Sequence, residues 1–316
     1  MPSRPATISV GIGLFLGACG PQRYEIVYTD QYTAMQAVCR WDEYRALYDD
    51  RGALMEDTGR DEEGPILDYP STACIDHMLG DLKIDLPAFL EADGLEDPYA
   101  AATDEAGLNA DGYLSTVLLG LRGLVLFELQ RPESYRGQPL VQPEFIDLLN
   151  EVAEKSGVER AEAPHYNFIT SVIQGLYVGD PPWVEPNPDR FDAGARYWRT
   201  HSVMSLYDVF CCGMAPGHAV LLHEASHFDP DNHHVPCEED SIYFEVGTGL
   251  CDADETGIRG FVVSSMAIYQ TAFANQRVRS DLAHVAYDNL TRINTINSDG
   301  ELNGEHQKLH DDVFWY

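Results

Sequence analysis

The feature that most restricts the fold is the segment VLLHEASHFD, residues 220–229. It places His223 and His227 four positions apart, directly after a run of apolar residues. Residues i and i+4 lie on the same face of an α-helix. Pro216 and Gly217 precede the run, and proline is favoured in the first turn of a helix. The segment therefore predicts a helix that buries its apolar residues and holds two imidazoles side by side.

The same segment predicts a metal site, because His223-Glu224-Ala225-Ser226-His227 has the pattern HExxH. Two imidazoles one turn apart can reach one metal ion at about 2.0–2.1 Å. The pattern resembles that of the zincin family of zinc metallopeptidases, over about ten of the 316 residues. The resemblance implies that His223 and His227 bind Zn²⁺. It also implies that Glu224 is the general base for peptide-bond hydrolysis by a metal-activated water.

A third metal ligand is needed, and two adjacent histidines are candidates. His233 lies six residues after His227, which is the spacing of the metzincin pattern HExxHxxGxxH. Pro230 stands where that pattern has a glycine, however, and proline cannot adopt a left-handed turn. His234 is three residues before Cys237, and a disulfide at that cysteine would hold the histidine rigidly. We therefore expect His234 as the ligand, with His233 as an alternate.

An acidic residue is the other alternate for the third ligand. Gluzincins and aspzincins take this ligand from a second helix, and here Asp252 begins an acidic stretch, residues 252–255. The nearby residues 247–250, GTGL, only partly resemble the aspzincin pattern GTxDxxYG. Acidic residues at a helix start also favour the helix dipole without any metal. Met266 resembles the methionine of a metzincin turn, but it lies within a helical pattern, which favours a place in the core.

The N-terminus resembles that of a bacterial lipoprotein. Residues 1–18 contain a short apolar stretch followed by small residues, which is typical of a signal peptide. Leu16-Gly17-Ala18-Cys19 resembles a lipobox, which implies a lipid on Cys19. The resemblance implies a lipid anchor in a bacterial membrane, at the periplasmic or cell surface, with residues 19–30 as a tether. Gly20 is not the Asp that is associated with inner-membrane retention, so the outer membrane is expected in a Gram-negative cell.

Six further cysteines fit an exported chain, because disulfides form in oxidising compartments. Up to three disulfides are expected, and the pairing stays open among fifteen possibilities. A Cys237–Cys251 bond would close a short loop just after the HExxH segment, and a Cys39–Cys74 bond would hold the N-terminal part. Cysteine-ligated zinc is disfavoured because the chain has no CxxC pair. The six cysteines are Cys39, Cys74, Cys211, Cys212, Cys237 and Cys251.

Charge excludes one class of partner. The chain has 20 Lys and Arg against 52 Asp and Glu, a formal net charge of −32. A phosphate backbone would be repelled, so nucleic acid is not expected as a partner. Hydrophobic residues make up 44%, enough for a packed core.

The pattern of apolar residues predicts a mainly α fold, with α+β possible: a zincin-like helical core with a small sheet, stabilised by disulfides. The proline-rich segment 179–190 separates an N-terminal helical region, residues 31–178, from a zincin-like catalytic region, residues 191–316. Helical spacing is found in residues 31–48, 114–129, 144–156, 195–210, 217–228, 257–275 and 280–296.

These observations favour a zinc metallopeptidase that acts on peptides or proteins. The alternative is a non-catalytic surface lipoprotein that binds a metal or ligand on a zincin-like scaffold. A calcium-dependent adhesion module is a third hypothesis, because residues 109–114 and 297–302 are similar to the middle of an EF-hand loop. Both segments lack the glutamate that such a loop requires at its twelfth position.

Overall fold

The structure is a computed structural model, and the statements below refer to the residues that it describes. These are residues 30–39, 71–99, 112–129, 151–152, 154, 165–184, 195–207, 214–238, 251–270 and 276–295. The expected signal peptide, the lipid anchor on Cys19 and most of the tether lie outside them, as do Cys211 and Cys212.

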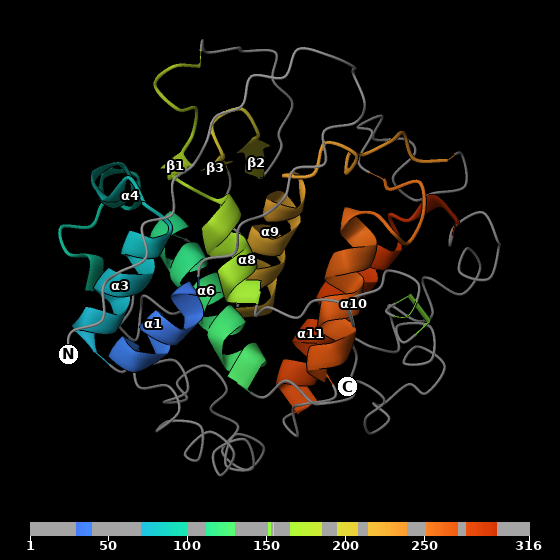
Figure 1. Cartoon of the computed structure of the whole chain (residues 1–316), viewed down its shortest axis with the longest axis horizontal. Helices are drawn as coiled ribbons and strands as arrows, with labels where there is room; N and C mark the ends of the chain where they lie inside the picture. The colour runs from blue at the N-terminus through green and yellow to red at the C-terminus, as the bar shows by residue number, and fades with distance from the viewer. Residues whose placement is uncertain are drawn as a thin grey trace, which may run out of the picture.

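The described residues form a mainly helical fold with a small three-stranded sheet, which confirms the predicted fold class at that level (Figure 1). No described helix has the length and apolarity needed to cross a membrane. In chain order the helices are α1 (Gln31–Cys39), α3 (Thr72–Asp81), α4 (Leu86–Asp93), α6 (Tyr113–Leu129), α8 (His165–Val172), α9 (Met214–Ser226), α10 (Ile258–Gln270) and α11 (Gln276–Leu290).

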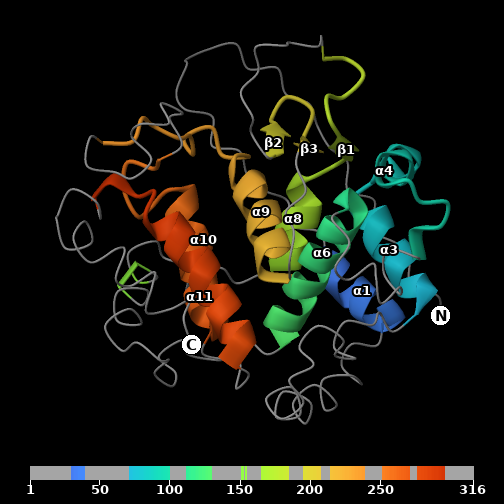
Figure 2. The ribbon, with the colours of Figure 1, turned by 180° about the vertical axis from the view of Figure 1, so that it is seen from behind.

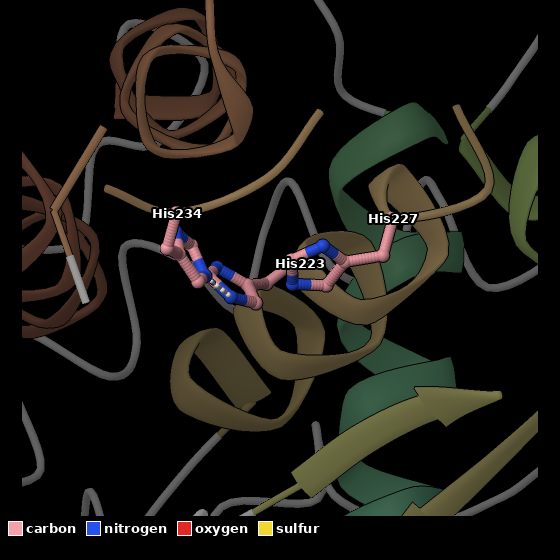
Figure 3. A group of neighbouring side chains, drawn as sticks. All are labelled: His223, His227 and His234. Atoms are coloured by element: carbon pink, nitrogen blue, oxygen red, sulfur yellow. Dashed lines mark hydrogen bonds between the residues drawn. The ribbon is translucent and has the colours of Figure 1, made fainter. Parts of the chain in front are cut away.

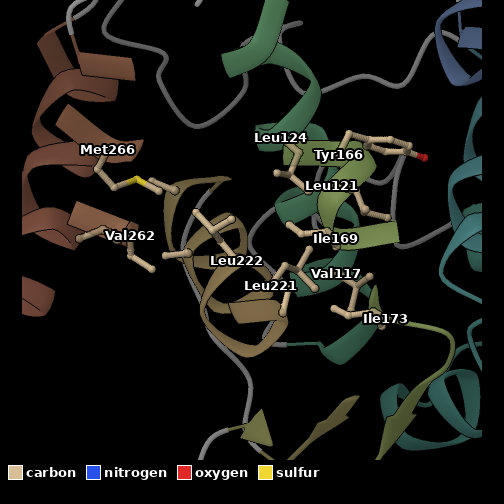
Figure 4. Close-up of a cluster of buried hydrophobic side chains, with 14 of the residues drawn as sticks. Val117, Leu121, Leu124, Tyr166, Ile169, Ile173, Leu221, Leu222, Val262 and Met266 are labelled. Atoms are coloured by element: carbon tan, nitrogen blue, oxygen red, sulfur yellow. The ribbon is translucent and has the colours of Figure 1, made fainter. Parts of the chain in front are cut away.

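Helix α9 lies at the centre of the molecule, with α6 and α8 on one side and α10 and α11 on the other (Figures 1 and 2). Its apolar residues Leu221 and Leu222 are buried among side chains of α6, α8 and α10 (Figure 4). Burying one leucine side chain contributes about 1.5–3 kcal/mol. One core cluster includes residues from both predicted regions, 31–178 and 191–316, so both regions contribute to the surroundings of α9.

Two glycines allow α6 and α9 to approach closely. A Cβ atom on Gly120 of α6 would lie 2.7 Å from the backbone carbonyl carbon of Gly217 in α9. A Cβ atom on Gly217 would lie 2.7 Å from the backbone oxygen of Thr116. The apolar segment 114–129 forms a helix, as predicted, with residues 114–121 and 123–124 buried, and one of its glycines forms this contact surface.

The prediction of a helix over 195–210 is wrong. Strands β2 (Ala195–Trp198) and β3 (Val203–Leu206) form a hairpin there, and β1 (Leu176–Val178) pairs in parallel with β3. All four residues of β3 are buried, so the alternation expected of a strand with one exposed face is missing. Ser202 in the connecting turn has φ of 53°, a left-handed conformation that interrupts any helix.

Among the described residues two disulfides are present, in the two pairs considered above among the fifteen possible. Cys39–Cys74 joins α1 to α3, and Cys237–Cys251 closes the loop after α9. Met266 lies inside α10 with no exposed surface, as its helical pattern predicted.

Candidate metal centre

The end of α9 presents the first two histidines of the site. His223 lies in the last turn of α9, and His227 follows directly after the helix ends at Ser226. The backbone N–H of His227 still donates to the carbonyl of Glu224 at 3.2 Å, so the helical turn continues to this residue. The ring centroids of the two histidines are 5.3 Å apart. The i, i+4 spacing therefore places the two imidazoles side by side, as predicted.

His234 approaches these two rings from the loop that follows α9 (Figure 3). Its Nε2 atom lies 3.0 Å from Nε2 of His223, and its ring centroid is 4.9 Å from each of the other two. Ligand atoms of the three histidines lie within 4.8 Å of one another. Two zinc-bound nitrogens at a tetrahedral angle are about 3.3 Å apart. The arrangement thus fits three ligands of one metal ion.

The two alternates for the third ligand lie outside this group. His233 is exposed, and its Nδ1 atom lies 3.0 Å from the backbone oxygen of Asp231. Asp252 is buried behind His234, with its Oδ1 atom 2.9 Å from Nδ1 of that histidine. Asp252 therefore contacts a candidate ligand rather than joining the group itself.

Hydrogen bonds at Nδ1 orient two of the rings. Nδ1 of His227 lies 3.2 Å from the backbone oxygen of Asn232, and Nδ1 of His234 lies against Asp252. In each pair the oxygen accepts, so the imidazole carries its proton on Nδ1 and has its Nε2 lone pair available. This is the tautomer that binds a metal through Nε2.

The loop that carries the third histidine is fixed at several points. The Cys237–Cys251 disulfide and a pair of backbone hydrogen bonds between Val235 and Cys251, 2.7 and 3.1 Å long, join it to the start of the next segment. The Asn294 side chain donates to the carbonyl of Pro236 at 3.0 Å. The loop is therefore attached to the region around α10 and α11.

Glu224 follows His223 in α9 and is buried, with 6% of its surface exposed. Burial raises the pKa of this carboxyl to about 7, while the positive charge of Arg259 and the backbone N–H of Tyr197 act in the opposite direction. Arg259 is itself buried, which lowers the pKa of its guanidinium to about 10. A carboxyl with a pKa near 7 can both accept and donate a proton at neutral pH.

Burial also keeps His223 and His227 neutral. It lowers the pKa of His223 well below the ordinary value and that of His227 to about 4, with the positive charge of Arg259 contributing in both cases. Neutral imidazole is the form that coordinates metal ions. These two residues therefore present unprotonated nitrogens at neutral pH.

Comparisons with protein families, with curated proteins and with solved structures gave no match. The assignment of the site therefore rests on its own residues. Sequence reasoning missed the contacts of Glu224 with Arg259 and Tyr197, which belong to α10 and β2. The one available indication was an arginine within the otherwise apolar start of the 257–275 pattern.

Proposed function

We propose that the protein is a zinc-dependent metallopeptidase in which His223, His227 and His234 bind Zn²⁺ and Glu224 is the general base. The observation that carries the proposal is the convergence of the three imidazoles, together with the burial of Glu224, the residue that follows His223. Three protein ligands leave a fourth coordination position for water or substrate, which distinguishes catalytic zinc sites from closed structural ones.

Bound zinc supplies a Lewis acid that polarises the scissile carbonyl and lowers the pKa of a coordinated water. Glu224 then takes a proton from the attacking water and delivers it to the leaving amine. Its neighbours suit this role, because burial favours the protonated form while Arg259 and the Tyr197 N–H favour the carboxylate.

The proposed substrates are peptides or proteins at a bacterial membrane, where a lipid on Cys19 would anchor the enzyme. The alternative, a non-catalytic lipoprotein that binds a metal on this scaffold, uses the same three histidines. It gives no role to the buried carboxyl of Glu224. Glu224 therefore favours hydrolysis over binding alone.

Zinc analysis and hydrolysis of casein test the proposal together. We expect one zinc per chain and measurable cleavage. Glu224→Gln keeps the size of the side chain but removes the base, so it should retain zinc and lose about 10²–10⁴-fold in turnover. Glu91→Gln, at an exposed position on α4, is the matched control and should be as active as the parent protein.

Three results would contradict parts of the proposal. Absence of zinc would overturn the metal centre. Stoichiometric zinc without cleavage would favour the non-catalytic alternative. Undiminished turnover by Glu224→Gln would remove Glu224 as the base.

A further inference from the structure

We infer that Asp252 is a positioning residue of the metal centre: it holds His234 in the tautomer and orientation that direct Nε2 at the metal. The inference rests on the proposed function, because it assigns a role toward the zinc that the three histidines would bind. Asp252 and His234 are separated by 18 positions in the sequence.

The carboxylate of Asp252 is held by donors on both sides. Its Oδ1 atom accepts from Nδ1 of His234 at 2.9 Å, and its Oδ2 atom accepts from the backbone N–H of Arg259 at 2.5 Å. Only 2% of the residue is exposed. With each oxygen engaged by a different donor, the carboxylate cannot rotate without breaking one of these bonds. The orientation of the His234 ring is therefore set by the start of α10.

The backbone of Asp252 is fixed as well. Its N–H donates to the carbonyl of Arg292 at 2.8 Å, and its carbonyl accepts from the N–H of Asn294 at 2.9 Å. These two residues follow α11, and they make a short bridge between Asp252 and Ile293. Asp252 thus connects the loop histidine to both C-terminal helices.

Gly257 also supports the positioning role of Asp252, because the Asp252 carboxylate occupies the space that a side chain at residue 257 would need. A Cβ atom on Gly257 would lie 2.4 Å from Oδ2 of Asp252. Any larger residue would displace the carboxylate or the turn before α10. The absence of a side chain at Gly257 therefore leaves space for the Asp252 carboxylate at the start of α10.

The chemistry explains why an acid is suited to this position. A neutral imidazole has one protonated nitrogen, and a carboxylate at Nδ1 places the proton there and frees Nε2. A charged acceptor makes a stronger hydrogen bond than a neutral one. His227 lies on the helical turn and has only a backbone carbonyl at Nδ1, whereas the loop histidine has the carboxylate.

The test compares zinc affinities of the full chain by competition with a chelator. Asp252→Asn keeps the shape but removes the charge, and we expect its dissociation constant for zinc to be about 10–100-fold higher. Asp254→Asn is the matched control, since the Asp254 side chain bonds the N–H of Thr256 and not the histidine. Its affinity should equal that of the parent protein. Gly257→Ala should displace the Asp252 carboxylate and also weaken zinc binding.

A second measurement needs no substitution and so does not depend on how the variants fold. Nitrogen-15 NMR of the zinc-loaded parent protein reports which nitrogen of His234 is protonated. We expect the proton on Nδ1 and zinc on Nε2. The reverse assignment, or equal zinc affinity of Asp252→Asn and the parent, would overturn the inference while the metal centre stands. A parent protein that binds no zinc would instead overturn the proposed function, and the inference with it.

Discussion

The two halves of the metal centre are positioned in different ways. The helix half, His223, Glu224 and His227, belongs to α9 and the turn that follows it, and α9 is packed among other helices through its apolar residues. The loop half, His234 with Asp252 behind it, is held by a disulfide, backbone hydrogen bonds and a carboxylate. A helix fixes the spacing of its own side chains, whereas a loop needs outside contacts to do the same.

The cost in conformational entropy explains why the helix half and the loop half are held by different contacts. Ordering one backbone residue costs about 1–2 kcal/mol in conformational entropy. In α9 that cost is offset by helical hydrogen bonds and by burial of residues such as Leu222, which are needed for the core in any case. The loop has few buried apolar side chains, so crosslinks and polar contacts have to keep it in place. The halves should therefore respond to different substitutions.

The largest expected effect comes from removing a ligand from either half. A zinc site with four ligands has a binding free energy of about 10–16 kcal/mol, so one ligand is worth about 3 kcal/mol, or about 100-fold in affinity. We expect His234→Ala to weaken zinc binding by about that factor. His223→Ala should weaken it further, because the two remaining histidines would then come from separate segments.

The adjacent His233 offers a control for the loop half. It is exposed and lies outside the group of three, so His233→Ala should leave zinc binding unchanged in the same chelator competition. Stronger loss of zinc in His233→Ala than in His234→Ala would reverse the assignment of the third ligand.

Removing each disulfide in turn distinguishes effects on the stability of the fold from effects on zinc binding. Replacing Cys237 and Cys251 by serine should cost about 3 kcal/mol of unfolding free energy, as expected for a loop of this length. It should also raise the zinc dissociation constant about tenfold, because ordering even one freed loop residue costs about 1–2 kcal/mol. Denaturant titration and chelator competition measure the two effects.

The other disulfide is the matched control. Cys39 and Cys74 join α1 to α3, and their longer loop predicts a loss of about 4 kcal/mol on replacement by serine. Zinc affinity of the folded protein should not change. Equal losses of zinc affinity in both double variants would mean that the disulfide acts on the site only through overall stability.

The helix half could be predicted from sequence because its information is local. The spacing of His223 and His227 and the apolar run before them specify a helix with two imidazoles on one face. The presence of disulfides was also predictable, from the expected compartment and the even number of cysteines, but their pairing was not.

The loop half and the sheet could not be predicted to the same degree. Pro230 and Cys237 favour His234 over His233 as the ligand but leave both open, since the direction of each side chain depends on how the loop is attached. The sequence does not tell whether an acidic residue binds a metal or accepts a hydrogen bond from a metal ligand. The contact of Asp252 with His234 could therefore be found only in the folded structure. The fully buried β3 has no alternation, and its apolar residues match a helical pattern as well as a strand.

The smallest expected effect concerns the packing that holds the helix half. Gly120→Ala should push α9 away from α6, because the new methyl group would lie 2.7 Å from backbone atoms of Gly217. Overpacking of this kind costs about 1–3 kcal/mol. Gly80→Ala in α3 is the matched control, since nothing lies within 4 Å of its Cβ position, and alanine there should be neutral or stabilising. If denaturant titration gave Gly120→Ala the stability of Gly80→Ala, close packing against α6 would not be what positions the helix half.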